Sequence, residues 1–179
     1  MAYIIDADIG NTKEDFDNWQ KAWKTYFSYL ESLRERIPKS AFEFATAPWH
    51  YGNKDSRNLH DAWVNSLTIR EPAQGARNEI RTLEIEVTLL GPYHDGITTL
   101  IYRDVKTYSL DTPAGCVHGG EKRLNYIAHG DWLVDEIRLS ERGLVIHEVK
   151  FERGSRWLIE CKDIECTWKP TSAPYSQTP

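Results

Sequence analysis

The spacing of apolar residues changes once along this chain, at Pro38, and this change limits the folds that the chain can adopt. Before Pro38, apolar side chains recur every three or four residues, at Phe16, Trp19, Trp23, Phe27, Leu30, Leu33 and Ile37. This spacing places them on one face of a helix. Asn11 or Thr12 can cap its first turn, with an acidic residue three positions later, and a proline ends a helix. We therefore predict one amphipathic helix between Thr12 and Pro38.

After Pro38, apolar and polar residues alternate, which is typical of strands with one wet face in antiparallel sheets. The alternation is clearest over residues 83–89, 98–103, 133–139, 145–151 and 157–168. In the last segment the phase slips by one residue near Lys162, which indicates a β-bulge. Turn residues at 72–75, 91–96, 140–143 and 152–155 separate the segments, so neighbouring strands are expected to pair in chain order.

These two patterns predict an α+β fold, in which the N-terminal amphipathic helix packs on a mainly antiparallel β-sheet. The aromatic face of the helix is expected to pack against an apolar surface, and one face of the sheet is the simplest such surface. A partner or a second copy is the alternative cover. The sheet is expected to be a meander that forms a partly closed barrel or a sandwich.

The same patterns predict one domain with a tail. Residues 1–38, a short strand or arm followed by the helix, are expected to belong to the same domain as the β-rich body of residues 39–170. Residues 171–179 are rich in Pro, Ser and Thr and are expected to be flexible.

The composition argues against several classes of protein. The chain has 179 residues and a formal net charge of -5, the opposite of what phosphate binding requires, so no nucleic-acid partner is expected. There is no long apolar run and no secretory signal pattern, so no membrane partner is expected. Three cysteines, Cys116, Cys161 and Cys166, make a poor disulfide framework and favour a cytoplasmic location.

Histidines beside aspartates are the candidate parts of an enzyme site. If the chain is a metal-dependent or acid/base hydrolase, the pocket would gather His60, Asp61, His94, Asp135 and His147. Against this, the chain has no nucleophile motif, no phosphate-binding glycine loop and no close metal-ligand spacing. Asp and His are also common in turns. We therefore predict no catalytic residue, no metal and no cofactor.

The segment from Trp132 to Ile137 contains two adjacent carboxylates in an apolar run. Asp135 is in phase with the apolar residues, so it is expected to face the dry side, whereas Glu136 points to the other face. A buried carboxylate needs a cationic or hydrogen-bonding partner, and His60 or His147 is the expected one. A structural polar network is the favoured interpretation, and a buried acid in a pocket is the alternative.

Aromatic residues near predicted loops are the candidate binding residues. They are Trp49, Tyr51, Trp63 and Tyr93, and such residues often anchor protein interfaces. The long loop of residues 112–125 adds His118, Lys122 and Arg123. The alternative for the aromatic residues is that they cap the ends of the sheet.

Several short motifs run from residue 59 to residue 168. They are Leu59-His60-Asp61-Ala62, Ile85-Glu86-Val87, Tyr102-Arg103-Asp104-Val105, Trp132-Leu133-Val134-Asp135-Glu136-Ile137, Gly143 with His147-Glu148-Val149, and Ile159-Glu160-Cys161-Lys162-Asp163-Ile164. In these motifs the chain resembles a group of bacterial domains with a His-Asp-Ala opening, loosely similar to immunity proteins of polymorphic toxin systems. The resemblance implies a small cytoplasmic β-rich domain and assigns no catalytic residue.

The function expected from these features is a non-enzymatic protein-binding module, of the immunity or antitoxin type, that masks a partner. Its acidic charge would steer a basic partner such as a nuclease. One alternative is the hydrolase described above. The other is a homo-oligomeric structural subunit that uses the helix as its interface.

Overall fold

The computed structural model describes residues 2–7, 12–52, 54–112 and 129–171. Cys116 and the predicted binding residues His118, Lys122 and Arg123 lie outside the described residues, as does the predicted tail beyond residue 171. The described residues form two helices, α1 (Lys13–Ser32) and α2 (Lys39–Thr46), and ten strands. The strands are β1 (Trp63–Arg70), β2 (Ala73–Gln74), β3 (Ile80–Arg81), β4 (Glu84–Leu90), β5 (Gly96–Arg103), β6 (Thr107–Leu110), β7 (Trp132–Leu139), β8 (Val145–Phe151), β9 (Arg156–Cys161) and β10 (Asp163–Pro170).

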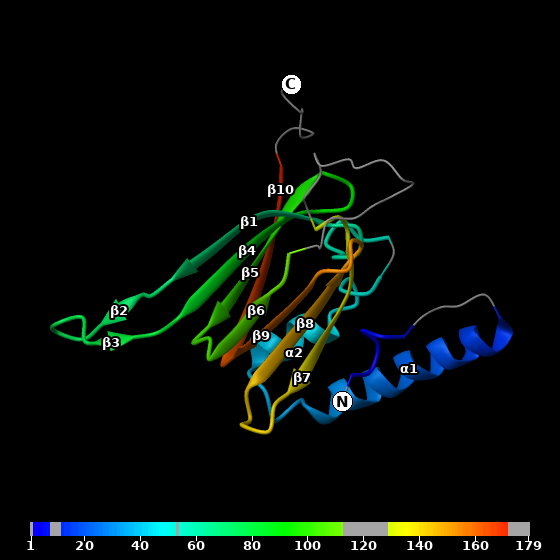
Figure 1. The fold of residues 1–179 in the computed structure, drawn as a ribbon, viewed down its shortest axis with the longest axis horizontal. Helices are drawn as coiled ribbons and strands as arrows, with labels where there is room; N and C mark the ends of the chain where they lie inside the picture. The colour runs from blue at the N-terminus through cyan, green and yellow to red at the C-terminus, as the bar shows by residue number, and fades with distance from the viewer. Residues whose placement is uncertain (1, 8–11, 53, 113–128, 172–179) are drawn as a thin grey trace.

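The strands form two four-stranded antiparallel sheets, ordered β1-β4-β5-β10 and β6-β9-β8-β7, and the hairpin β2–β3 (Figure 1). The α+β prediction is confirmed, and the sheets do not close into a barrel. Four of the five segments with clear alternation coincide with one strand each, apart from Leu83, and the segment of residues 157–168 spans two strands, β9 and β10. Buried residues from both sheets and both helices share one hydrophobic core. No helix among the described residues is long and apolar enough to cross a membrane.

The slip of phase near Lys162 marks the passage of the chain from one sheet to the other. β9 ends at Cys161 in the second sheet, and β10 begins at Asp163 in the first. The backbone N–H of Lys162 donates to the carbonyl of Arg103 at 2.9 Å and fixes this corner. The predicted β-bulge is therefore wrong here, because each strand keeps its own phase and only the sheet changes.

Two helices replace the single helix that was predicted. α1 begins with a capping box between Thr12 and Asp15 and ends at Ser32, and a turn leads to Pro38. The expectation that Pro38 ends the helix is wrong, because α1 ends at Ser32 and Pro38 is the N-cap of α2. The second helix was not predicted, because its eight residues are too few to show a period.

α1 lies along the edge strand β7 and covers it with tyrosine hydroxyls. The backbone N–H of Ile137 donates to the Tyr26 hydroxyl at 2.6 Å, and that of Leu139 donates to the Tyr29 hydroxyl at 2.9 Å. An edge strand otherwise presents unpaired N–H and C=O groups that can recruit another chain. The helix therefore closes this edge of the sheet.

Part of the predicted dry face of α1 is exposed. Leu30 and Leu33 are buried as expected, but Phe16 is 46% exposed and Phe27 is 44% exposed. In Figure 1 the N-terminal half of α1 extends beyond β7. The prediction that the sheet covers the whole aromatic face is therefore wrong, because the helix is longer than the surface it packs against.

Candidate functional site

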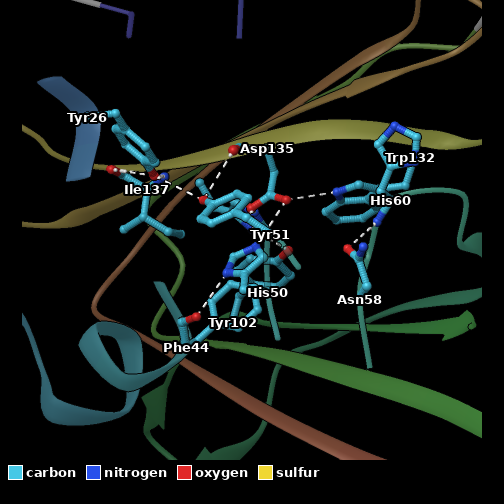
Figure 2. A network of polar contacts seen from close by, with 11 residues as sticks. Tyr26, Phe44, His50, Tyr51, Asn58, His60, Tyr102, Trp132, Asp135 and Ile137 are labelled. Atoms are coloured by element: carbon cyan, nitrogen blue, oxygen red, sulfur yellow. Dashed lines mark hydrogen bonds and ion pairs between the residues drawn. The ribbon is translucent and has the colours of Figure 1, made fainter. Parts of the chain in front are cut away.

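A buried polar network centred on Asp135 lies between β7 and the segment that follows α2 (Figure 2). Alternation along β7 turns Asp135 inward, as its phase predicted. Its carboxylate lies 2.9 Å from His50 Nε2, 2.9 Å from His147 Nε2 and 2.9 Å from Trp132 Nε1. All four residues are at most 2% exposed. Asp135 therefore has the partners that a buried carboxylate requires.

The donors and acceptors of the network fix its proton count. His50 Nδ1 lies 2.9 Å from the carbonyl of Phe44, which can only accept, so Nδ1 carries a proton. His50 Nε2 faces the carboxylate, so the bond between them must also contain a proton. The pair of His50 and Asp135 therefore holds one proton more than a neutral imidazole beside a carboxylate.

The second imidazole extends the network to β5. His147 Nε2 donates to Asp135, and its Nδ1 lies 2.8 Å from the Tyr102 hydroxyl. Burial raises the pKa of Tyr102 well above its ordinary value of 10.0, so its hydroxyl stays protonated. Both nitrogens of His147 therefore have a hydrogen-bonding partner.

Two aromatic rings stack on the imidazole of His50. The centroid of the Phe44 ring lies 4.3 Å from that of His50, and the centroid of the Tyr51 ring lies 4.1 Å from it. Burial alone would raise the pKa of Asp135, but the charge of His50 and the hydrogen bonds from His147 and His50 together lower it below its ordinary value of 3.8.

The network is closed to reactants in this structure. A general acid or base must reach the proton that it transfers, directly or through one water. The side chains of His50 and His147 are 0% exposed and that of Asp135 is 3% exposed. The nitrogen-to-oxygen distances of 2.9 Å are those of hydrogen bonds. Among the described residues, no group of three or more His, Cys, Asp and Glu side chains could hold a metal ion.

Only two of the five residues proposed for an enzyme pocket meet. Asp135 and His147 are in contact, and His50 takes the place predicted for His60. His60 and Asp61 form an exposed pair with each other, with Nδ1 and Oδ1 2.8 Å apart. His94 packs on the ring of Trp63, with centroids 4.7 Å apart. The structure therefore does not gather the five residues in one pocket, because the remaining three lie in turns and bends.

Sequence reasoning missed His50 for a specific reason. Its position depends on α2, whose C-terminal end it follows, and α2 was not predicted. The signal that was present is the run Trp49-His50-Tyr51, whose aromatic residues lie near a predicted loop and were therefore predicted as interface anchors. The same run is equally compatible with a buried histidine that packs against aromatic neighbours.

The predicted binding residues separate into two groups. Tyr51 is largely enclosed: its hydroxyl lies 3.2 Å from that of Tyr26, and its ring packs on His50, so it is not a surface anchor. Trp49 is half-buried, with the guanidinium of Arg57 5.6 Å from its ring. Trp63 is 43% exposed and Tyr93 is 57% exposed, so these two can contact a partner.

Glu136 is buried too, on the opposite face of β7 from Asp135. Its carboxylate accepts the backbone N–H groups of Tyr3 and Ile4 at 2.9 Å and of Ile5 at 3.2 Å. The Nε atom of Arg138 lies 3.2 Å from its other oxygen. The N-terminal segment, which forms turns and bends and no strand over residues 3–7, therefore covers the face of β7 that was expected to be wet.

The exposed part of α1 carries a continuous row of aromatic rings. Phe16 and Trp19 have centroids 5.9 Å apart, as do Trp19 and Trp23, and Trp23 and Phe27 have centroids 5.6 Å apart. We call these four residues the aromatic row. Trp23 and Phe27 also contact Tyr51, so these two rings join the row to the core, and the row continues along the helix to Phe16.

Comparison of the chain with protein-family models and with curated proteins finds no match. The resemblance to immunity proteins stays a prediction that rests on short motifs.

Proposed function

We propose that this protein is a non-enzymatic protein-binding module and that the aromatic row on α1 is its docking surface. The exposure of Phe16 and Phe27 carries the proposal, because they end a row of four aromatic side chains on a helix that extends beyond the sheet. A contiguous exposed apolar surface marks an interaction site more often than scattered apolar residues do. Aromatic anchors also supply much of the binding energy at interfaces.

The charge of the protein supports a basic partner. The first turn of α1 carries Glu14 and Asp15, beside the outer end of the aromatic row, and the whole chain has a formal net charge of -5. Complementary charge steers a partner and raises the rate of association. A basic toxin masked by this protein fits that charge and also fits the resemblance to immunity proteins. Cys161 and Cys166 are free thiols, which supports a reducing cytoplasm as the location.

The proposal can be tested by capture of partners from the host with wild-type protein and two double variants. Phe16→Ala with Phe27→Ala shortens the aromatic row at two exposed positions. Thr25→Ala with Ser28→Ala changes two exposed positions elsewhere on the same helix and is the matched control. Circular dichroism checks that all three proteins are folded.

We expect the wild-type and control proteins to recover the same basic protein, and the Phe double variant to bind it about tenfold or more weakly. Equal capture by all three proteins would move the docking surface away from α1. Recovery of no partner by the wild-type protein would overturn the proposal itself.

A further inference from the structure

The two sheets have four edges, and three of them are covered or short. Tyrosines of α1 close the β7 edge, β6 has only four residues, and β10 contacts α2, where the Ser40 hydroxyl lies 2.6 Å from the Asp163 carboxylate. The fourth edge is β1, which has eight residues. Among the described elements β1 packs extensively only against β4.

β1 has few of the features by which proteins protect an edge, and these lie at its two ends. Between Trp63 and Arg70 it has no Pro and no Lys. Its single charge, on Arg70, is already paired with Glu84 and Glu86. A bulge lies between Val64 and Ser66, so the stretch from Ser66 to Arg70 is regular. This stretch can accept another strand along its open side.

Exposed apolar side chains gather around the same edge. Trp63 is 43% exposed, Ile69 is 40% exposed and Tyr93, in the turn beside the start of β1, is 57% exposed. Beyond Arg70 the hairpin β2–β3 extends away from the rest of the molecule as an arm (Figure 1). The arm carries Ile80, which is 54% exposed. A two-stranded ribbon is marginally stable alone, so the arm gains from a partner.

We propose that two copies of this protein pair through antiparallel β1 strands across a two-fold axis at Thr68. The open backbone edge requires an extended strand, and a two-fold interface requires a surface that is complementary to itself. Centring the pair on Thr68 uses the regular stretch of β1. Thr68 then faces Thr68, and Leu67 faces Ile69 of the second copy. Arg70 faces Ser66, so no like charges meet.

This register also covers the exposed apolar residues. Continuing it past Arg70 brings Pro72 and Ala73 of the arm opposite Val64 and Trp63 of the second copy. The arm of each copy therefore extends along the start of β1 in the other copy, near its exposed aromatic residues. The β1-β4-β5-β10 sheet of one copy and the same sheet of the second copy then form one continuous sheet of eight strands. This surface is distinct from the aromatic row, so the inference does not depend on the proposed function.

Light scattering coupled to size exclusion tests the dimer, with the full chain and three variants. The wild-type protein is expected at twice its chain mass of 20.8 kDa. Thr68→Lys places a charge on the axis, at an exposed position, and should raise the dimer dissociation constant about a hundredfold or more. Thr167→Lys, at an exposed position on β10, is the control and should remain dimeric. The Phe16→Ala and Phe27→Ala double variant should also remain dimeric.

A cysteine on the axis tests the register. In a background with Cys116→Ser, Thr68→Cys should form an intermolecular disulfide on mild oxidation, because residues that face each other across antiparallel strands have Cα atoms about 4.5 to 5.5 Å apart. Thr167→Cys should not. A wild-type monomer, a dimer that survives Thr68→Lys, or equal crosslinking of the two cysteine variants overturns the proposal. Loss of the dimer in the Phe double variant alone assigns the contact to α1 and overturns it too.

Discussion

Asp135 binds three donor side chains in a part of the protein that water does not reach. A buried carboxylate with its donors is weak evidence for stability, because the cost of desolvation offsets much of the attraction. The effect of the network is clearer when the carboxylate is removed, since its donors are then left without their acceptor in the core. The network therefore makes the packing of His50 and His147 against β7 dependent on one carboxylate.

Asp135→Asn tests this dependence. The amide replaces one of the two acceptor oxygens with an NH₂ donor and removes the negative charge that the surrounding donors bind. We expect the free energy of unfolding to fall by about 3 to 5 kcal/mol, measured by urea denaturation. Asp61→Asn is the matched control: it is exposed and has a positive φ, which Asn tolerates, so its effect should stay within about 0.5 kcal/mol. A loss below about 1 kcal/mol for Asp135→Asn would contradict the argument.

The same carboxylate predicts a pH dependence. The pKa of Asp135 is lower in the folded protein than its ordinary value of 3.8. A carboxyl with a lowered pKa stabilises the fold fully above its unfolded pKa, and this contribution is lost as the pH falls toward the folded pKa. The difference in unfolding free energy between wild-type protein and Asp135→Asn should therefore shrink below about pH 4. A difference that grows under acid would show that the carboxyl is protonated in the fold.

The sequence predicted part of this network. The phase of Asp135 in an apolar run required a buried partner, and His147 was one of the two histidines offered. His60 was the other, and the structure places it in a surface turn. His50 is the partner of Asp135 because of how α2 and the following turn pack. This is a tertiary contact, and the spacing of apolar residues along the chain does not predict it.

At the scale of elements, α1 closes the β7 edge with side-chain oxygens where another strand would use its backbone. Burial raises the pKa of Tyr26 well above its ordinary value of 10.0, so its hydroxyl stays neutral and can both accept and donate. It accepts from the N–H of Ile137 and lies 3.2 Å from the Tyr51 hydroxyl. The edge is therefore closed without a further strand.

Two tyrosine-to-phenylalanine variants compare a buried contact with a partly exposed one. Tyr26→Phe leaves the N–H of Ile137 buried without its acceptor and should cost about 1 to 3 kcal/mol of unfolding free energy. Tyr29→Phe removes the acceptor for Leu139 at a half-buried site, where water can replace it, so the loss should be about 1 kcal/mol or less. If both variants lost the same amount of unfolding free energy, burial would not explain the difference expected between the two hydrogen bonds.

Alternation predicted the strands well because each keeps one face in the core, and β8 alternates without exception from Val145 to Phe151. The helical spacing predicted that α1 exists, but it did not predict how much of the helix finds a surface to cover. The spacing of apolar residues shows which face of the helix is apolar. It carries no information on the width of the sheet that this face packs against. The exposure of Phe16 could therefore be learned only from the structure.

At the scale of the whole molecule, the chain crosses between the sheets at Lys162, and residues of both sheets contribute to one core. Trp132 and Ile137 of the second sheet belong to the same buried cluster as Leu100 and Tyr102 of the first. Because neither sheet has a separate core, we expect thermal unfolding in one transition. Tryptophan fluorescence and far-ultraviolet circular dichroism should give coincident curves, and two separated midpoints would contradict this.

The contact between Tyr26 and β7 has a consequence for synthesis of the protein. Tyr26 and Ile137 are 111 positions apart in the chain, so a ribosome adding about 5 to 20 residues per second makes the partner strand about 6 to 22 s after the helix. Throughout that interval β7 has not been synthesised, so the four aromatic rings of α1 cannot pack beside it. Chaperones are therefore expected to bind α1 during translation. Slowing translation before residue 137 should lengthen the time for which they stay bound.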